Sequence, residues 1–234
     1  MTTYFIADLH LCDQQPDITR RFLKFCKEQA RHARALYILG DFFEYWLGDD
    51  ALDKTAIVLQ SALKDLSDAG VKLFFMAGNR DFLLGQEFAD SCGMQLLEEP
   101  TTIDLYGENV LLVHGDAQCT DDIPYQEVRK MFRNKDWQQQ FLSMDIQQRI
   151  EFAKQARVKS QEHTQSSDHQ IMDVNANEIA QLFSKHQVKT IIHGHTHRPA
   201  VHQSQDLKRI VLGDWHHQTS YLVADKEGFQ LISA

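Results

Sequence analysis

The chain has 234 residues, of which 43% are hydrophobic and 24% charged, a composition typical of a soluble globular protein with a full core. This length favours one large domain or one domain with an insertion. The net charge of −9 argues against indiscriminate nucleic-acid binding, so no nucleic-acid partner is expected. No signal peptide, disulfide pattern or apolar run of about 18 residues is visible, and this predicts a cytoplasmic protein without a spanning helix.

The first half of the chain alternates short apolar runs with amphipathic segments. The apolar runs predict strands at Tyr4–Ala7, Ala35–Leu39 and Val71–Met76. Apolar residues at helical spacing predict helices at Asp17–Arg34 and Leu52–Ala69. This alternation favours right-handed βαβ units and a parallel sheet.

The second half has a different pattern. Two apolar runs around Tyr106-Gly107-Glu108 predict a hairpin, and helical spacing resumes over Asp173–His186. The strands expected here are Thr101–Leu105, Asn109–Val113, Thr190–Ile192, Ala200–Gln203, Arg209–Leu212, Ser220–Ala224 and Phe229–Ile232. The predicted fold is therefore an α/β two-sheet sandwich, with parallel strands first and antiparallel strands later.

The segment from about 121 to 168 shows no strand pattern. Its apolar residues recur at mostly helical spacing, and its stretch Thr120–Ser160 holds eight basic and six acidic residues. We interpret it as a helical insertion, a lid, into a single domain spanning 1–234, with Ser160–Gln170 as its return loop. The alternative is that its aromatic and aliphatic side chains simply pack onto the sandwich.

Side chains that bind metals follow five of the predicted strands. A single Asp or His in such a place is commonly a helix cap or a satisfied polar group, but the carboxyl ends of strands in α/β sheets are where sites form. Alternation along the first strand should also turn Asp8 and His10 to the same side. The seven candidates are Asp8, His10, Asp41, Asn79, His114, His195 and His197.

The chemistry of these seven side chains favours two metal ions. Mixed carboxylate, amide and imidazole ligands suit Mn²⁺, Fe²⁺, Co²⁺ or Zn²⁺, whereas Ca²⁺ prefers oxygen alone. Seven ligands are too many for one such ion, and two ions that share one carboxylate would use them all. Paired divalent ions catalyse phosphoryl transfer by lowering the pKa of water and by stabilising the attacking and leaving oxygens.

Five motifs resemble the signature of the calcineurin-like metallophosphoesterases. They are Asp8-Leu9-His10, Gly40-Asp41, Gly78-Asn79-Arg80-Asp81, His114-Gly115-Asp116 and Gly194-His195-Thr196-His197. Three further segments, at 43–50, 119–122 and 171–175, are similar to the bacterial UDP-2,3-diacylglucosamine hydrolases, the pyrophosphatases of lipid A synthesis. The resemblance covers most of the chain outside the insertion.

The resemblance implies two Mn²⁺ ions per chain. The first would bind Asp8, His10, Asp41 and His197, and Asp41 would bridge to a second ion completed by Asn79, His114 and His195. A metal-activated water would attack the α-phosphorus of UDP-2,3-diacylglucosamine and release UMP and 2,3-diacylglucosamine 1-phosphate. The catalytic set would be Asp41, Asn79, Arg80 and His195.

The resemblance also implies a substrate-binding set. Arg80 stands where many members of the superfamily have a histidine; an arginine cannot donate a proton near neutral pH, but its fork binds phosphate oxygens. The chain departs from the pattern where Thr164 replaces an asparagine and Ser167 a lysine, and Lys159 or Arg157 are candidates to replace the lost charge. The set is Asn79, Arg80, Asp122, Ser160, Thr164, Ser167 and His195.

The apolar insertion with its basic residues also predicts a peripheral association with the cytoplasmic side of the inner membrane. We expect Arg133, Lys135 and Arg149 to contact anionic lipid, and we expect no obligate protein partner. Two alternatives remain open. One is a phosphoesterase for a nucleotide, phosphoprotein or cyclic phosphodiester, which Arg80 and the insertion disfavour. The other is a catalytically inactive scaffold, which the complete set of ligands disfavours.

Overall fold

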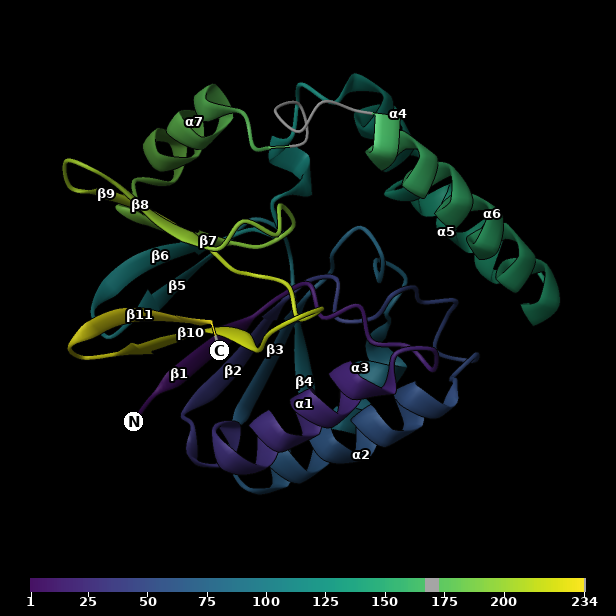
Figure 1. Ribbon diagram of the computed structural model, residues 1–234, viewed down its shortest axis with the longest axis horizontal. Helices are drawn as coiled ribbons and strands as arrows, with labels where there is room; N and C mark the ends of the chain where they lie inside the picture. Colours follow the sequence, from purple (N-terminus) through teal and green to yellow (C-terminus); the bar gives the residue numbers. More distant parts are fainter. Residues whose placement is uncertain (167–172, 234) are drawn as a thin grey trace.

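Two β-sheets lie face to face, and helices cover their outer faces (Figure 1). The computed structural model describes residues 1–166 and 173–233, without the side chains of 161 and 163–166. The larger sheet has the order β11-β10-β1-β2-β3-β4. Its strands are β1 (Thr3–Ile6), β2 (Ala35–Leu39), β3 (Lys72–Met76), β4 (Met94–Leu97), β10 (Ser220–Asp225) and β11 (Gly228–Ser233).

The smaller sheet has the order β5-β6-β7-β9-β8. β6, β7 and β9 run parallel, and the edge strands β5 and β8 run antiparallel to their neighbours. Its strands are β5 (Thr101–Leu105), β6 (Glu108–Leu112), β7 (Thr190–His193), β8 (Ala200–Ser204) and β9 (Leu207–Val211). The predicted two-sheet α/β sandwich is confirmed, but both sheets are mixed, so parallel and antiparallel pairing do not divide along the chain as expected.

Helices α1 (Pro16–Glu28), α2 (Lys54–Asp68) and α3 (Gln86–Cys92) cover the larger sheet, and α7 (Ala176–His186) covers the smaller one (Figure 1). Short 3-10 turns occupy Ala30–His32 and Asp116–Gln118. The first predicted helix was too long, because the chain turns after Glu28 to enter β2. Helix α3 and strand β4 were missed, since each is short and only Met94 of β4 is fully buried.

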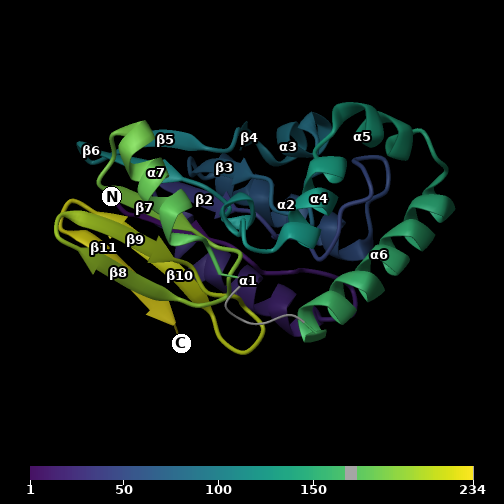
Figure 2. The same ribbon diagram turned by 90° about the horizontal axis from the view of Figure 1, so that it is seen from above.

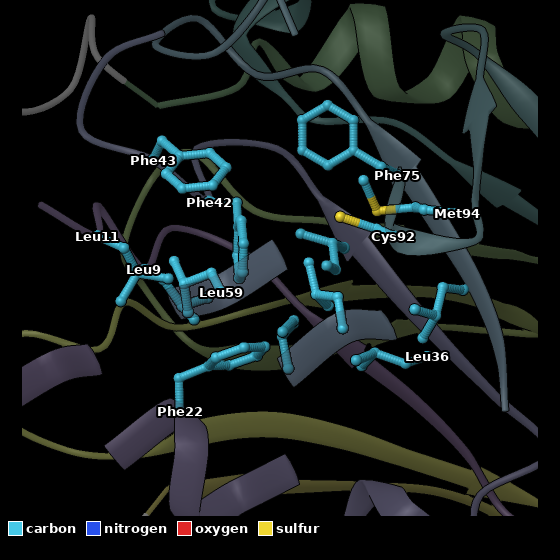
Figure 3. Close-up of a cluster of buried hydrophobic side chains, with 14 of the residues drawn as sticks. Leu9, Leu11, Phe22, Leu36, Phe42, Phe43, Leu59, Phe75, Cys92 and Met94 are labelled. Atoms are coloured by element: carbon cyan, nitrogen blue, oxygen red, sulfur yellow. The ribbon is translucent and has the colours of Figure 1, made fainter. Parts of the chain in front are cut away.

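Two apolar layers hold the sandwich together. One lies between the sheets, where Phe5, Tyr37 and Phe74 stack in sequence with ring centroids 4.9 and 4.5 Å apart. The other lies between the larger sheet and its helices and includes Phe22, Leu59 and Phe75 (Figure 3). Because β1 and β2 are buried on both faces, they appear in the sequence as unbroken apolar runs.

Three helices, α4 (Ile123–Phe132), α5 (Lys135–Leu142) and α6 (Ile146–Ser166), form the insertion. They stand apart from the two sheets beyond the carboxyl ends of β1, β2 and β3, as both ribbon views show (Figures 1 and 2). The expected return loop from Ser160 is wrong in its first part, because α6 continues through Ser166. We refer to these three helices as the lid.

Candidate metal centre and the cavity beneath the lid

The seven candidate ligands lie in loops that follow β1, β2, β3, β6 and β7. The structure brings Asp8, His10 and Asp41 together, and the ligand atoms of these three side chains lie within 4.8 Å of one another. His197 joins this group: its Nε2 lies 3.2 Å from Nε2 of His10 and 3.5 Å from Oδ1 of Asp8. We call these four residues the first ligand group.

A second ligand group lies beside the first and shares Asp41 with it. Ligand atoms of Asp41, His114 and His195 again lie within 4.8 Å of one another. Oδ1 of Asn79 lies 3.0 Å from Nε2 of His114 and 2.9 Å from Nδ1 of His195, which places the amide oxygen between the two rings. One carboxylate between two clusters is the arrangement that a pair of bridged ions requires.

Five of the seven candidates have a left-handed backbone. The φ angles are 57° for Asp8, 53° for His10, 51° for Asp41, 68° for His195 and 54° for His197. Few residues other than glycine adopt this conformation, and such strain concentrates at functional sites. Asp8 and His10 are therefore brought together by a strained loop beyond β1, and the alternation of side chains along a strand is not the cause.

Two glycines allow the loops to approach closely enough for this arrangement. A Cβ on Gly78 would lie 2.2 Å from Oδ1 of Asp41, and one on Gly40 would lie 2.4 Å from Nδ1 of His114. Neither distance is compatible with a side chain at the glycine. Gly40 and Gly78 therefore leave the space that Asp41 and His114 occupy.

Asp81 holds two of the ligand loops in register. Its buried carboxylate accepts backbone N–H groups of Gly78 at 2.8 Å and of Phe42 at 2.7 Å, with longer contacts to Asp41 and Phe43 at 3.3 Å. An ion pair between Arg80 and Asp81, the simplest alternative for that arginine, is not formed. Asp81 instead joins the loop after β2 to the loop after β3, and so it fixes Asp41 relative to Asn79.

The electrostatics of the two groups fit divalent cations. Oδ1 of Asp8 is buried without a hydrogen-bond partner among the described residues. Burial would lower the pKa of His114, but Asp41, Asp116 and Asp8 outweigh it and raise that pKa to about 9. Burial and the neighbouring His114 lower the pKa of His195 to about 4, so this imidazole is neutral and able to bind a metal. The carboxylates gathered in the site need positive charge, such as that of divalent cations, to balance them.

A cavity of about 530 Å³ lies between the ligand groups and the lid. Its walls are largely apolar and include a cluster of aromatic rings: those of Phe82 and Phe132 stack at 5.3 Å, and Trp137 lies 4.9 Å from Phe132 and 5.2 Å from Phe141. Asn79 and Arg80 line the end nearest the metal ligands. The lid side chains thus pack onto the larger core and also enclose space, so both readings of their function hold in part.

The expected substrate-binding residues are placed as follows. Arg80 and Ser160 line the cavity, as do Arg157 and Lys159. Asp122 is buried and its carboxylate accepts the backbone N–H of Tyr125, capping α4. Thr164 belongs to α6, but its side chain is not described, and Ser167 lies outside the described residues.

Several arginines of the lid face the sandwich and not the solvent. Arg149 is only 3% exposed, donates to the carbonyl of Leu47 at 2.6 Å and pairs with Asp50 at 2.5 and 2.7 Å. Arg133 donates to the carbonyls of Ala77 and Gly78 at 3.1 and 2.9 Å. The expectation that Arg149 contacts lipid is wrong, because its guanidinium is buried and paired. Arg133 likewise points toward the sandwich, where it binds backbone carbonyls.

The sequence analysis missed two groups beside the ligands. In the first, Asp116 accepts hydrogen bonds from Tyr125 at 2.7 Å and from Arg129 at 2.8 Å, which ties α4 to the loop after β6. In the second, Glu44 contacts Arg157 of α6 at 2.5 Å. Glu44 could have been found as a lone acid in the apolar segment that follows Asp41.

Comparisons with known proteins agree with this geometry. The family model described as calcineurin-like phosphoesterase matches residues 1–199. A UDP-2,3-diacylglucosamine hydrolase of Stenotrophomonas maltophilia strain K279a is 50% identical over 99% of this chain and 98% of its own length. One of Haemophilus ducreyi is 47% identical over 99% of this chain and all of its own. A solved structure titled as a novel archaeal phosphodiesterase matches with a TM-score of 0.52 at 11% identity over the whole of both chains, which supports the fold.

Proposed function

Since the chain belongs to the calcineurin-like phosphoesterase family, and within it to the UDP-2,3-diacylglucosamine hydrolases, we propose that it hydrolyses the pyrophosphate bond of UDP-2,3-diacylglucosamine. Water attacks the α-phosphorus, and the products are UMP and 2,3-diacylglucosamine 1-phosphate. The observation that carries the proposal is that the two ligand groups, which share Asp41, lie at one end of a largely apolar cavity. That end of the cavity suits a diphosphate, and the rest suits acyl chains.

The cofactor in this proposal is a pair of Mn²⁺ ions. Asp8, His10, Asp41 and His197 would hold the first, and Asp41, Asn79, His114 and His195 would hold the second. When bound, such ions lower the pKa of a water and neutralise charge on the phosphoryl group. Hard carboxylate and amide oxygens beside imidazole nitrogens suit Mn²⁺.

The side chains of this protein position the substrate. Arg80 lies at the polar end of the cavity, its Nε is buried without a hydrogen-bond partner among the described residues, and its Nη1 is 3.6 Å from Glu44. This guanidinium has N–H groups left to bind diphosphate oxygens and to stabilise the charge that builds up during transfer. Ser160 and Lys159 extend the polar wall toward the nucleotide and sugar. Asp122, Thr164 and Ser167 complete the proposed headgroup contacts.

The apolar part of the cavity receives the acyl chains. About 530 Å³ falls within the range of about 300–1,000 Å³ typical of small-molecule sites. Burying each methylene of an acyl chain favours binding by about 0.8 kcal/mol, so a lipid substrate should bind more tightly than a simple phosphodiester.

The lid also suits contact with a membrane, which we place at the cytoplasmic face of the inner membrane. Ile123 of α4 is 68% exposed and Ile146 of α6 is 43% exposed, and Lys135 of α5 is exposed as well. No helix in the described part of the chain has both the length and the apolar character needed to span a bilayer. Replacement of Lys135 and Ile146 by Glu should weaken co-sedimentation with anionic vesicles; unchanged binding would remove this part of the proposal.

Substrate preference tests the proposed function. Purified protein with Mn²⁺ is incubated with UDP-2,3-diacylglucosamine or with bis(p-nitrophenyl) phosphate, and the initial rates are compared at equal concentration. We expect a large preference for the lipid nucleotide. A higher rate with the generic phosphodiester would overturn the substrate assignment and leave only a metallophosphoesterase.

A further inference from the structure

We propose that Glu44 is a positioning residue that couples the lid to the metal centre, a role that rests on the proposed function. Its carboxylate contacts three groups from different parts of the molecule. Oε1 lies 2.5 Å from Nε of Arg157 on α6 and 3.6 Å from Nη1 of Arg80 after β3. Oε2 lies 3.3 Å from Nδ1 of His10, a member of the first ligand group.

The backbone holds Glu44 firmly at this junction. The residue lies three positions after Asp41, and its N–H donates to the carbonyl of Leu11 at 3.1 Å. Leu11 also bridges to Phe43, so the loops after β1 and β2 are joined on either side of the ligands. The Glu44 side chain therefore projects from the same rigid loops that carry His10 and Asp41.

Because Glu44 and its partners are largely buried, their ion pairs are stronger than exposed pairs on the surface. The exposed fraction of the Glu44 side chain is 16%, against 21% for Arg80 and 35% for Arg157. Ion pairs screened from water gain more from Coulomb attraction than surface pairs do, and removal of one partner leaves the other uncompensated. Loss of the Glu44 charge should therefore affect all three of its neighbours.

The two arginines need a shared carboxylate to remain side by side. Burial lowers the pKa of the Arg157 guanidinium, and the positive charge of Arg80 lowers it further. Glu44 offsets this repulsion and leaves the other N–H groups of both forks available to the cavity that both residues line. A diphosphate that enters meets two guanidinium groups already held together, one from the sandwich and one from the lid.

The third contact reaches the metal ligands. A carboxylate beside the outer nitrogen of a metal-binding histidine makes the ring a more basic ligand, most strongly where the two form a hydrogen bond. Nδ1 of His10 faces Glu44 without hydrogen-bond geometry, whereas Nε2 faces His197 at 3.2 Å. The lid arginine and the first ligand group are thus linked through a single side chain.

A double-mutant cycle of Glu44→Gln and Arg157→Gln tests the proposal. Loss of an outer-shell partner typically costs about 10–100-fold in metal affinity or activity, so we expect E44Q to bind Mn²⁺ about tenfold more weakly by calorimetry. We also expect E44Q and R157Q each to raise KM for UDP-2,3-diacylglucosamine about tenfold, and the double variant to lose clearly less than the product of the two single losses. R157Q should keep the wild-type affinity for Mn²⁺.

Asp50→Asn is the matched control. It removes an equally short pair between the sandwich and a lid arginine, Arg149, that does not touch the ligand groups. D50N should lower the melting temperature but leave Mn²⁺ affinity unchanged.

If the wild-type protein hydrolyses the substrate, either of two results would overturn the role of Glu44. One is a wild-type Mn²⁺ affinity in E44Q, and the other is a KM loss in the double variant equal to the product of the two single losses. Should E44Q fail to fold, R157Q with a wild-type KM overturns that role alone. Absence of turnover by the wild-type protein contradicts the proposed function instead.

Discussion

Ala153→Trp should make the enzyme insensitive to acyl-chain length. Ala153 lies on α6 and lines the cavity, so an indole there occupies space assigned to the acyl chains. In the wild-type enzyme, two further methylenes buried in the cavity gain about 1.6 kcal/mol, which corresponds to about a 15-fold rise in kcat/KM. In A153W this rise should disappear, because added methylenes no longer leave water. The ligand groups are untouched, so short-chain substrates should react at nearly the wild-type rate.

The assay measures UMP release from UDP-2,3-diacylglucosamines of increasing chain length, kept below their critical micelle concentrations. Val158→Trp is the control: it lies on the same helix and is 53% exposed, and it is not part of the cavity wall. V158W should retain the wild-type dependence on chain length. If A153W retains that dependence as well, the acyl chains do not bind in this cavity and the reasoning is refuted.

Three further predictions concern the ligand loops. Asp41→Ala should abolish turnover and reduce Mn²⁺ binding at both sites, because both ligand groups share this carboxylate; near wild-type activity would exclude the two-ion arrangement. Asp81→Asn should lower the free energy of unfolding in urea by about 1–3 kcal/mol, since an amide NH₂ cannot accept the buried N–H groups that converge there; an unchanged midpoint would contradict this role. Raising the pH from 6.5 toward 9 should strengthen Mn²⁺ binding, because a metal must displace the proton that the raised pKa of His114, about 9, retains. Over the same interval the metal-free protein should lose the stability that protonated His114 provides, so its melting temperature should fall. Mn²⁺ binding that does not change with pH would refute the first effect, and a constant melting temperature would refute the second.

The sequence was sufficient to predict the elements that determine the site. Strands β1 and β2 are buried on both faces, so their positions appear as continuous apolar runs. The ligand-type residues that follow each run are then brought together by the parallel arrangement of the strands. The number and chemistry of these residues already favoured two ions, and resemblance added the ligands of each ion, the choice of Mn²⁺ and the lipid substrate.

The remaining features depend on contacts between distant segments. Glu44, Arg157 and Arg80 are far apart in the chain, and nothing local shows that they meet. The burial of Arg149 was missed because a basic residue on a helix is ordinarily solvated, and its partner Asp50 lies 99 positions away. The left-handed loops that place Asp8 and His10 have no signal in a sequence of non-glycine residues.

We expect this protein to direct water to the α-phosphorus of UDP-2,3-diacylglucosamine. Hydrolysis in ¹⁸O-labelled water with Mn²⁺, followed by mass spectrometry of both products, tests it directly. We predict that one labelled oxygen is found in UMP and none in 2,3-diacylglucosamine 1-phosphate. Label in the lipid phosphate, or no hydrolysis at all, would contradict the account.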